Sequence, residues 1–134
     1  CYGVNPEIGI VVEVTHATDC PDVEHNGIGR VELGKGPVIA RGANINPMLF
    51  RLLVETAKAN DIPVQIIGVP RATGTDANVM QLSRGGVATA LVGIPLRYMH
   101  TPVETLDLHD LELAIKLLTA TLTRIDSHTS FIPA

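Results

Sequence analysis

Aromatic residues are scarce in this sequence. Its 134 residues include no tryptophan and only two tyrosines and two phenylalanines, so there is no aromatic platform on which a sugar ring could stack. Apolar residues nevertheless make up 46% of the chain, which predicts a globular protein with a core of valine, isoleucine, leucine and alanine.

Basic residues and cysteines are also few. Ten Lys and Arg stand against fourteen Asp and Glu, giving a net charge of -4, and no cationic cluster is present that could bind a phosphate backbone. Cys1 and Cys20 form no C-x-x-C pair and are too few for a disulfide framework. No apolar run approaches the roughly 20 residues of a membrane span. We therefore expect a cytoplasmic protein with neither nucleic acid nor membrane as a partner.

Apolar patterning predicts strands that alternate with helices. The length fits one folding unit, and the start at Cys1 rather than at a methionine leads us to expect that an N-terminal portion is missing. The expected strands span 8–14, 37–41, 63–68 and 88–94, and the expected helices span 46–60, 77–84 and 107–125. This order predicts an α/β three-layer sandwich with a mixed, largely parallel sheet.

In such sheets, reactive groups gather at the carboxyl ends of the strands. Two polar residues of this sequence are expected at such ends, where they follow or interrupt apolar strands. Glu13 ends the first strand, and an unpaired carboxylate there is costly to bury, so it should meet a metal ion or a cation. An ion pair with Arg41 or Arg97 is an equally good interpretation. His100 follows the last strand, and imidazole is a common metal ligand, although a structural, hydrogen-bonded histidine is the ordinary alternative.

The segment after Glu13 is rich in residues that can bind metals. His16 and Asp19 are candidates for the site because they follow Glu13 directly. For the later members we expect only a solvated loop: Asp22, Glu24 and His25. Asp76 can cap a helix, whose N-terminus could also bind a carbonyl or an anion. A G-x-S-x-G elbow is absent, which disfavours nucleophilic catalysis.

Four segments in order resemble metallopeptidase family forty-two, the TET-type aminopeptidases, whose older names include glutamyl aminopeptidase and cellulase or endoglucanase. The segments are VEVTHATDCP, LGKGPVIARGANINP, TGTDAN and GIPLRYMHTPVE. The resemblance covers nearly the whole chain. It implies a zinc-peptidase-like fold in which residues 1–134 are the C-terminal part of the catalytic metallopeptidase domain, without the N-terminal part and an inserted dimerisation domain. Family members commonly assemble into homo-oligomers, including dodecamers.

The resemblance also implies a site with two divalent metal ions, zinc or cobalt, bridged by an aspartate and a water. Carried onto this sequence, Glu13 is a ligand of one metal and His100 a ligand of the other, which places the two side chains within roughly 8 Å. The family usually has Asp in place of Glu13. Further residues are candidates for the substrate pocket or for contacts with the ligands: His16, Asp19, Asp76, Arg97 and Glu104.

The implied reaction is hydrolysis of N-terminal residues from peptides. The general-base glutamate is expected upstream of Cys1, so no catalytic residue is assigned here and the fragment alone should be inactive. A non-catalytic α/β binding or regulatory module is one alternative. A glycoside hydrolase, the other, needs two carboxylates about 5 to 9.5 Å apart. The expected partners are a peptide substrate, the missing N-terminal part and further copies of the protein.

Overall fold

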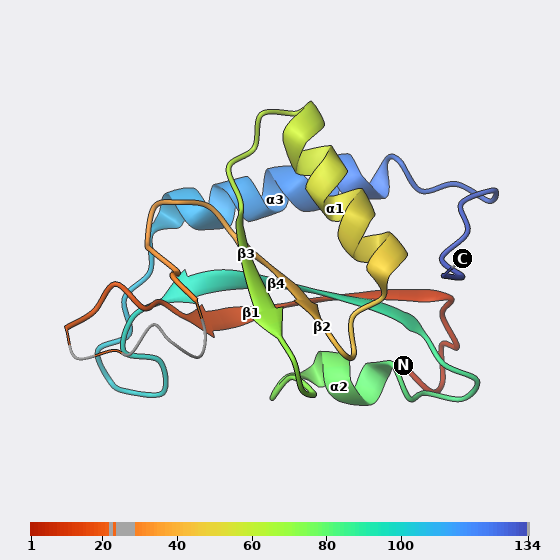
Figure 1. The fold of residues 1–134 in the computed structure, drawn as a ribbon, viewed down its shortest axis with the longest axis horizontal. Helices are drawn as coiled ribbons and strands as arrows, with labels where there is room; N and C mark the ends of the chain where they lie inside the picture. The colour runs from red at the N-terminus through yellow and green to blue at the C-terminus, as the bar shows by residue number, and fades with distance from the viewer. Residues whose placement is uncertain (22, 24–28, 134) are drawn as a thin grey trace.

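Four strands and three helices alternate along the part of the chain that the structure describes (Figure 1). The structure is a computed structural model and describes residues 1–21, 23 and 29–133. The elements are β1 (Ile8–His16), β2 (Val38–Gly42), α1 (Pro47–Ala59), β3 (Gln65–Val69), α2 (Asp76–Met80), β4 (Ala88–Leu96) and α3 (Leu108–Leu122). Within these ranges, no helix is long and apolar enough to cross a membrane.

The strands form one mixed sheet in the order β1-β4-β2-β3. The pairs β1–β4 and β2–β3 are parallel, whereas β2 and β4 run antiparallel. The predicted mixed, largely parallel sheet is therefore confirmed. Because of this topology, β1 and β4 end together at one end of the sheet and β2 and β3 end at the other.

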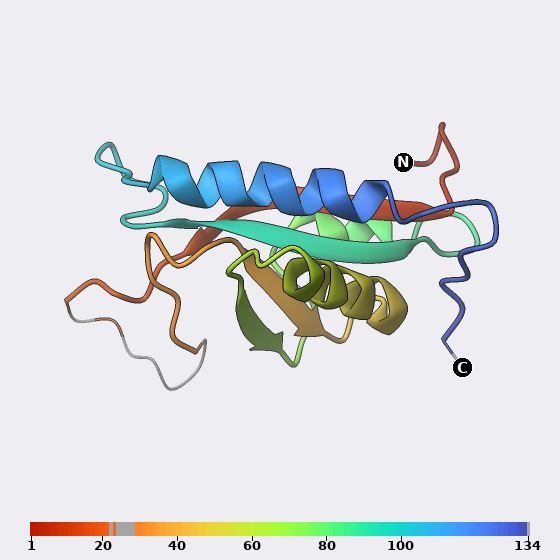
Figure 2. The same cartoon turned by 90° about the horizontal axis from the view of Figure 1, so that it is seen from above.

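The helices cover both faces of the sheet, which confirms the three layers. Helices α1 and α3 lie on one face and α2 lies on the other (Figures 1 and 2). The core under α1 and α3 includes Ile39, Leu49, Leu53, Val92 and Leu117. The core on the α2 face includes Val11, Val31, Val38, Ala77 and Leu91. Alternating residues of β1, β2 and β4 thus fill opposite cores, as strand geometry requires.

Helix α1 begins where the sequence predicts. Asn46 is the N-cap, and its side chain accepts hydrogen bonds from the backbone N–H groups of Met48 and Leu49, both at 3.0 Å. Pro47 occupies the first turn, where its missing N–H costs nothing. The helix then ends at Ala59, one residue before the expected boundary.

Two boundaries near the candidate site differ from the prediction. Strand β1 continues to His16, so Glu13 lies three residues before its end rather than at it. Pairing with β4 extends the strand, since Thr15 and His16 lie opposite Pro95 and Leu96. Helix α2 begins at Asp76 with Thr75 as its N-cap. Asp76 is therefore the first helical residue and not the cap.

Candidate functional site

Glu13 lies on the α2 face of the sheet. Side chains two residues apart on a strand point to the same face, so Glu13 shares its face with Val11, which is buried in the core under α2. Its half-buried carboxylate accepts a long hydrogen bond of 3.4 Å from the backbone N–H of Asp76. Across the described ranges, no salt bridge to Glu13 is formed. The ion-pair interpretation is therefore not observed, and Glu13 keeps oxygen lone pairs free.

The two arginines proposed as partners of Glu13 are engaged elsewhere. Arg97 binds Asp19, and the guanidinium of Arg41 lies over the Phe50 ring at 5.8 Å from its centroid. These contacts explain why, among the described residues, neither arginine forms an ion pair with Glu13.

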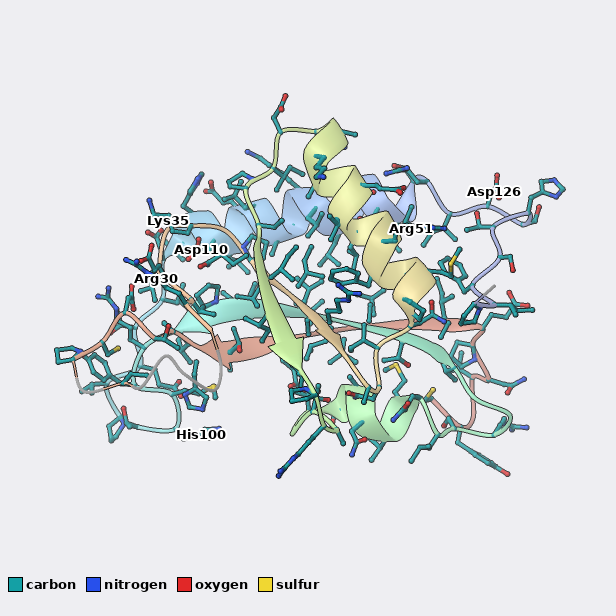
Figure 3. The ribbon with its side chains drawn as sticks, in the orientation of Figure 1. Arg30, Lys35, Arg51, His100, Asp110 and Asp126 are labelled. Carbon is teal, nitrogen blue, oxygen red and sulfur yellow. The ribbon has the colours of Figure 1, made fainter. Side chains whose placement is uncertain are left out.

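His100 lies in an exposed turn that follows β4. Reciprocal backbone hydrogen bonds of 2.9 and 3.1 Å between Arg97 and Thr105 close this turn. His100 has a positive φ of 67°, and Figure 3 shows it near the end of the sheet where β1 and β4 terminate, on the side where α2 lies. Among the residues that the structure describes, its ring makes no hydrogen bond, so the structural-histidine alternative is not observed there.

The strand register sets how Glu13 and His100 can meet. Glu13 lies opposite Gly93, three residues before the end of β4, which corresponds to about 10 Å along the strand at roughly 3.3 Å per residue. His100 follows four residues after Leu96. The turn must therefore fold back along the α2 face for the two side chains to come within roughly 8 Å, and that separation stays a prediction.

Asp19 and Arg97 join the segments that follow β1 and β4. Arg97 donates two hydrogen bonds to the Asp19 carboxylate, from Nε at 2.8 Å and from Nη2 at 2.7 Å. The hydrogen bonds from Arg97 are the main reason why the pKa of Asp19 lies below its ordinary value, and the Leu33 N–H adds to the effect. Burial acts in the opposite direction but is outweighed.

The other sequence candidates lie around these groups without joining them in one cluster. His16 is exposed, and alternation along β1 places it on the face opposite to Glu13. The exposed Asp76 contributes its backbone N–H to Glu13. The exposed Glu104 accepts a hydrogen bond from the N–H of His100 at 2.7 Å. Asp22, Glu24 and His25, for which a solvated loop was predicted, lie outside the described residues.

Sequence reasoning missed a buried carboxylate at the same end of the fold. Asp110 is fully buried and accepts hydrogen bonds from the N–H groups of Gly34, at 2.8 Å, and Gly36, at 2.7 Å. Figure 3 shows Asp110 at the start of α3, at the end of the sheet where the turn with His100 lies. Asp110 lies in one helical stripe with the buried Leu113 and Leu117, which was a usable signal of burial.

The donor atoms present fit a divalent metal, but only in part. A carboxylate oxygen and a neutral imidazole nitrogen are both zinc ligands, and Glu13 and His100 each offer one. Within the described ranges, no group of three His, Cys, Asp or Glu residues could hold a metal ion by itself. Further ligands would have to come from outside these residues.

Comparisons with known proteins place this geometry in a family. The model of the M42 glutamyl aminopeptidase family matches residues 1–117. The chain belongs to this family. The match includes both strands of the candidate site and most of α3, so the M42 assignment covers Glu13 and His100 alike.

Individual M42 relatives agree. Lysyl aminopeptidase of Pyrococcus furiosus is 49% identical over 123 residues, covering 90% of this chain and 34% of that protein. The crystal structure of a TET aminopeptidase from a marine-sediment Thaumarchaeota archaeon matches with a TM-score of 0.85 and 30% identity, over 93% of this chain and 35% of that chain. The TET1 peptidase of Pyrococcus horikoshii matches with a TM-score of 0.62 and 32% identity, over 83% and 32%. The chain thus spans about a third of these relatives.

Proposed function

We propose that this M42 chain is part of a metal-dependent aminopeptidase that removes N-terminal residues from peptides. The observation that supports this most directly is that Glu13 in β1 and His100 in the turn after β4 both have side-chain donor atoms available. Glu13 has no ionic partner and His100 has no ring hydrogen bond among the described residues, and both lie within the region that matches the family. A peptide is the expected substrate.

In this proposal each of the two residues binds one of two divalent ions, zinc or cobalt. Such ions, when bound, would lower the pKa of a coordinated water to about 7 and would polarise the scissile carbonyl. Glu13 contributes a carboxylate oxygen from the middle of a rigid strand, and His100 contributes an imidazole nitrogen from the turn. The general base and the remaining ligands belong to the rest of the protein, so this chain supplies part of the site and of the substrate pocket.

The rest of the protein would pack on an apolar surface of β1 and α3, on the face of the sheet opposite to Glu13. Strand β1 is an edge of the sheet within the described residues, and Val12 and Val14 on its α3 face are 48% and 43% exposed. Large apolar side chains of α3 are also exposed: Leu108, Leu111, Ile115 and Leu122. An open strand edge beside such a stripe is suited to an added strand and a covering layer. We propose that the N-terminal part of the catalytic domain fills this role.

Assembly and location are further parts of the proposal. The Pyrococcus horikoshii relative is described as assembling into a tetrahedron or a large octahedral shell, and another TET1 structure contains a dodecamer. We propose that the complete protein likewise forms a homo-oligomer, and that it is located in the cytoplasm, in keeping with its two free cysteines.

Metal analysis of the full-length enzyme tests the proposal. His100→Ala should lose about one metal ion per subunit, and hydrolysis of aminoacyl p-nitroanilides should fall below detection. His109→Ala is the matched control, because His109 is exposed on α3 and its only ionic contact among the described residues is Glu112 at 3.9 Å. Equal metal content and activity in the two variants would contradict the ligand assignment.

A further inference from the structure

His100 is held through its backbone rather than through its ring. Its φ of 67° lies in the left-handed region, which L-residues adopt uncommonly and at a cost that the surrounding contacts must offset. Tyr98, two residues earlier, also has a positive φ of 57°. The direction of the imidazole therefore depends on whatever stabilises this turn.

Glu104 is the side chain that fixes the backbone of His100. Its Oε1 atom accepts the His100 N–H at 2.7 Å across four residues, and a charge-assisted hydrogen bond of this length is a strong one. Thr101 supports the turn by donating its N–H and its hydroxyl to the Tyr98 carbonyl, at 3.2 and 2.6 Å. These contacts involve only the backbone of His100, and its imidazole has no hydrogen bond among the described residues.

The base of the turn is anchored by a second carboxylate. The backbone of Arg97 closes the turn with Thr105, while its guanidinium is held in bidentate fashion by Asp19. Asp19 in turn accepts the Leu33 N–H at 3.0 Å. The turn is thus tied to the segment that follows β1, the strand that carries Glu13.

We infer that Glu104 is a positioning residue for His100, which acts through the backbone N–H and not by touching the metal, with Asp19 and Arg97 anchoring the base of the same turn. The inference rests on the proposed role of His100 as a ligand. A ligand held by its main chain keeps its ring nitrogens available, while the turn limits where they can point. Contacts of this kind, one step from the metal, commonly change metal affinity by 10–100-fold.

The test compares Glu104→Ala with Glu104→Gln in the full-length enzyme. Glutamine keeps an oxygen that can accept the His100 N–H, whereas alanine does not. In the metal-free protein, Glu104→Ala should speed hydrogen exchange of the His100 amide roughly tenfold, and its affinity for zinc, measured by calorimetry, should fall about 10–100-fold. Glu104→Gln should stay within about threefold of wild type in both measurements.

Matched controls separate this role from a general loss of structure. Glu112→Ala and Glu112→Gln change an exposed glutamate of α3 and should leave both readouts unchanged. Unchanged exchange in Glu104→Ala would overturn the inference. The inference would also be overturned if Glu104→Gln and Glu104→Ala lost zinc affinity equally while hydrogen exchange of the His100 amide in Glu104→Gln stayed at the wild-type rate. Glu104 would then act through its charge or as a ligand.

The same set of variants distinguishes this inference from the proposed function. If His100→Ala kept both metal ions, the ligand role of His100 would be wrong, and the positioning role for metal binding would be wrong with it. His100→Ala could instead lose a metal ion while Glu104→Ala shows the wild-type rate of hydrogen exchange at the His100 amide and the wild-type affinity for zinc. In that case only the role of Glu104 would be wrong.

Discussion

The substitution Asp110→Ala should destabilise this chain more than any exposed substitution. Asp110 is fully buried, and its two carboxylate oxygens accept the N–H groups of Gly34 and Gly36 separately. A buried donor left without a partner costs about 1–3 kcal/mol. Two such donors predict a loss of about 2–6 kcal/mol, which is a large fraction of the stability of a domain of this size. The damage should centre on the loop before β2.

Equilibrium unfolding of the 134-residue chain in urea, followed by circular dichroism, measures this effect. Asp110→Asn retains one acceptor oxygen but turns an NH₂ group toward the second donor, so its loss should lie between that of wild type and that of Asp110→Ala. Glu112→Ala, two residues along the same helix and exposed, should change the free energy of unfolding by less than about 0.5 kcal/mol. A loss below about 1 kcal/mol for Asp110→Ala would refute the idea that this carboxylate holds the loop.

Gly36→Ala should lower the free energy of unfolding by about 2–3 kcal/mol, because Gly36 has a φ of 92° and an added Cβ would collide with the Pro63 carbonyl. Gly68 has open space around it, so Gly68→Ala should lower the same quantity by less than about 1 kcal/mol in the same urea experiment. The pKa of Asp19 is lowered in the folded chain, so its bond to Arg97 contributes fully to stability above the unfolded carboxyl pKa of about 3.9. This contribution is lost as the pH falls through the folded pKa of Asp19. The free energies of unfolding of wild type and Asp19→Asn should therefore converge in acid, and a difference that stays constant with pH would contradict this. The isolated chain should hydrolyse no leucyl p-nitroanilide, because in the proposed site the general base and most of the ligands come from the rest of the protein. Robust activity would refute this division of the site.

Local signals in the sequence predicted every element described, although α2 ends at Met80 and not at the expected residue 84. The Asn46-Pro47 pair marks a helix start because the amide side chain caps free N–H groups and proline fits the first turn, and α1 begins there. Aliphatic runs identified the four described strands. The run in β4 is continuous because both faces of this central strand are buried.

Long-range contacts explain what the sequence could not show. Glu13 was expected at a strand end, but pairing with β4 carries β1 on to His16, and no local signal encodes the length of a partner strand. The helical stripe of α3 signalled that Asp110 is buried, but the N–H groups that it binds lie 74 and 76 residues away and could not be identified from the sequence. The Asp19–Arg97 pair spans 78 residues. In each case the deciding partner comes from a distant part of the chain.

The most direct test of the central claim is a crystal structure of the full-length enzyme with zinc, using anomalous scattering at the zinc edge to locate the ions. Two anomalous peaks are expected, one with a Glu13 carboxylate oxygen and the other with a His100 ring nitrogen as a ligand, each at about 2.0–2.2 Å. The two side chains should also lie within roughly 8 Å of each other. Zinc bound without either residue, or Glu13 and His100 well beyond that separation, would contradict the assignment.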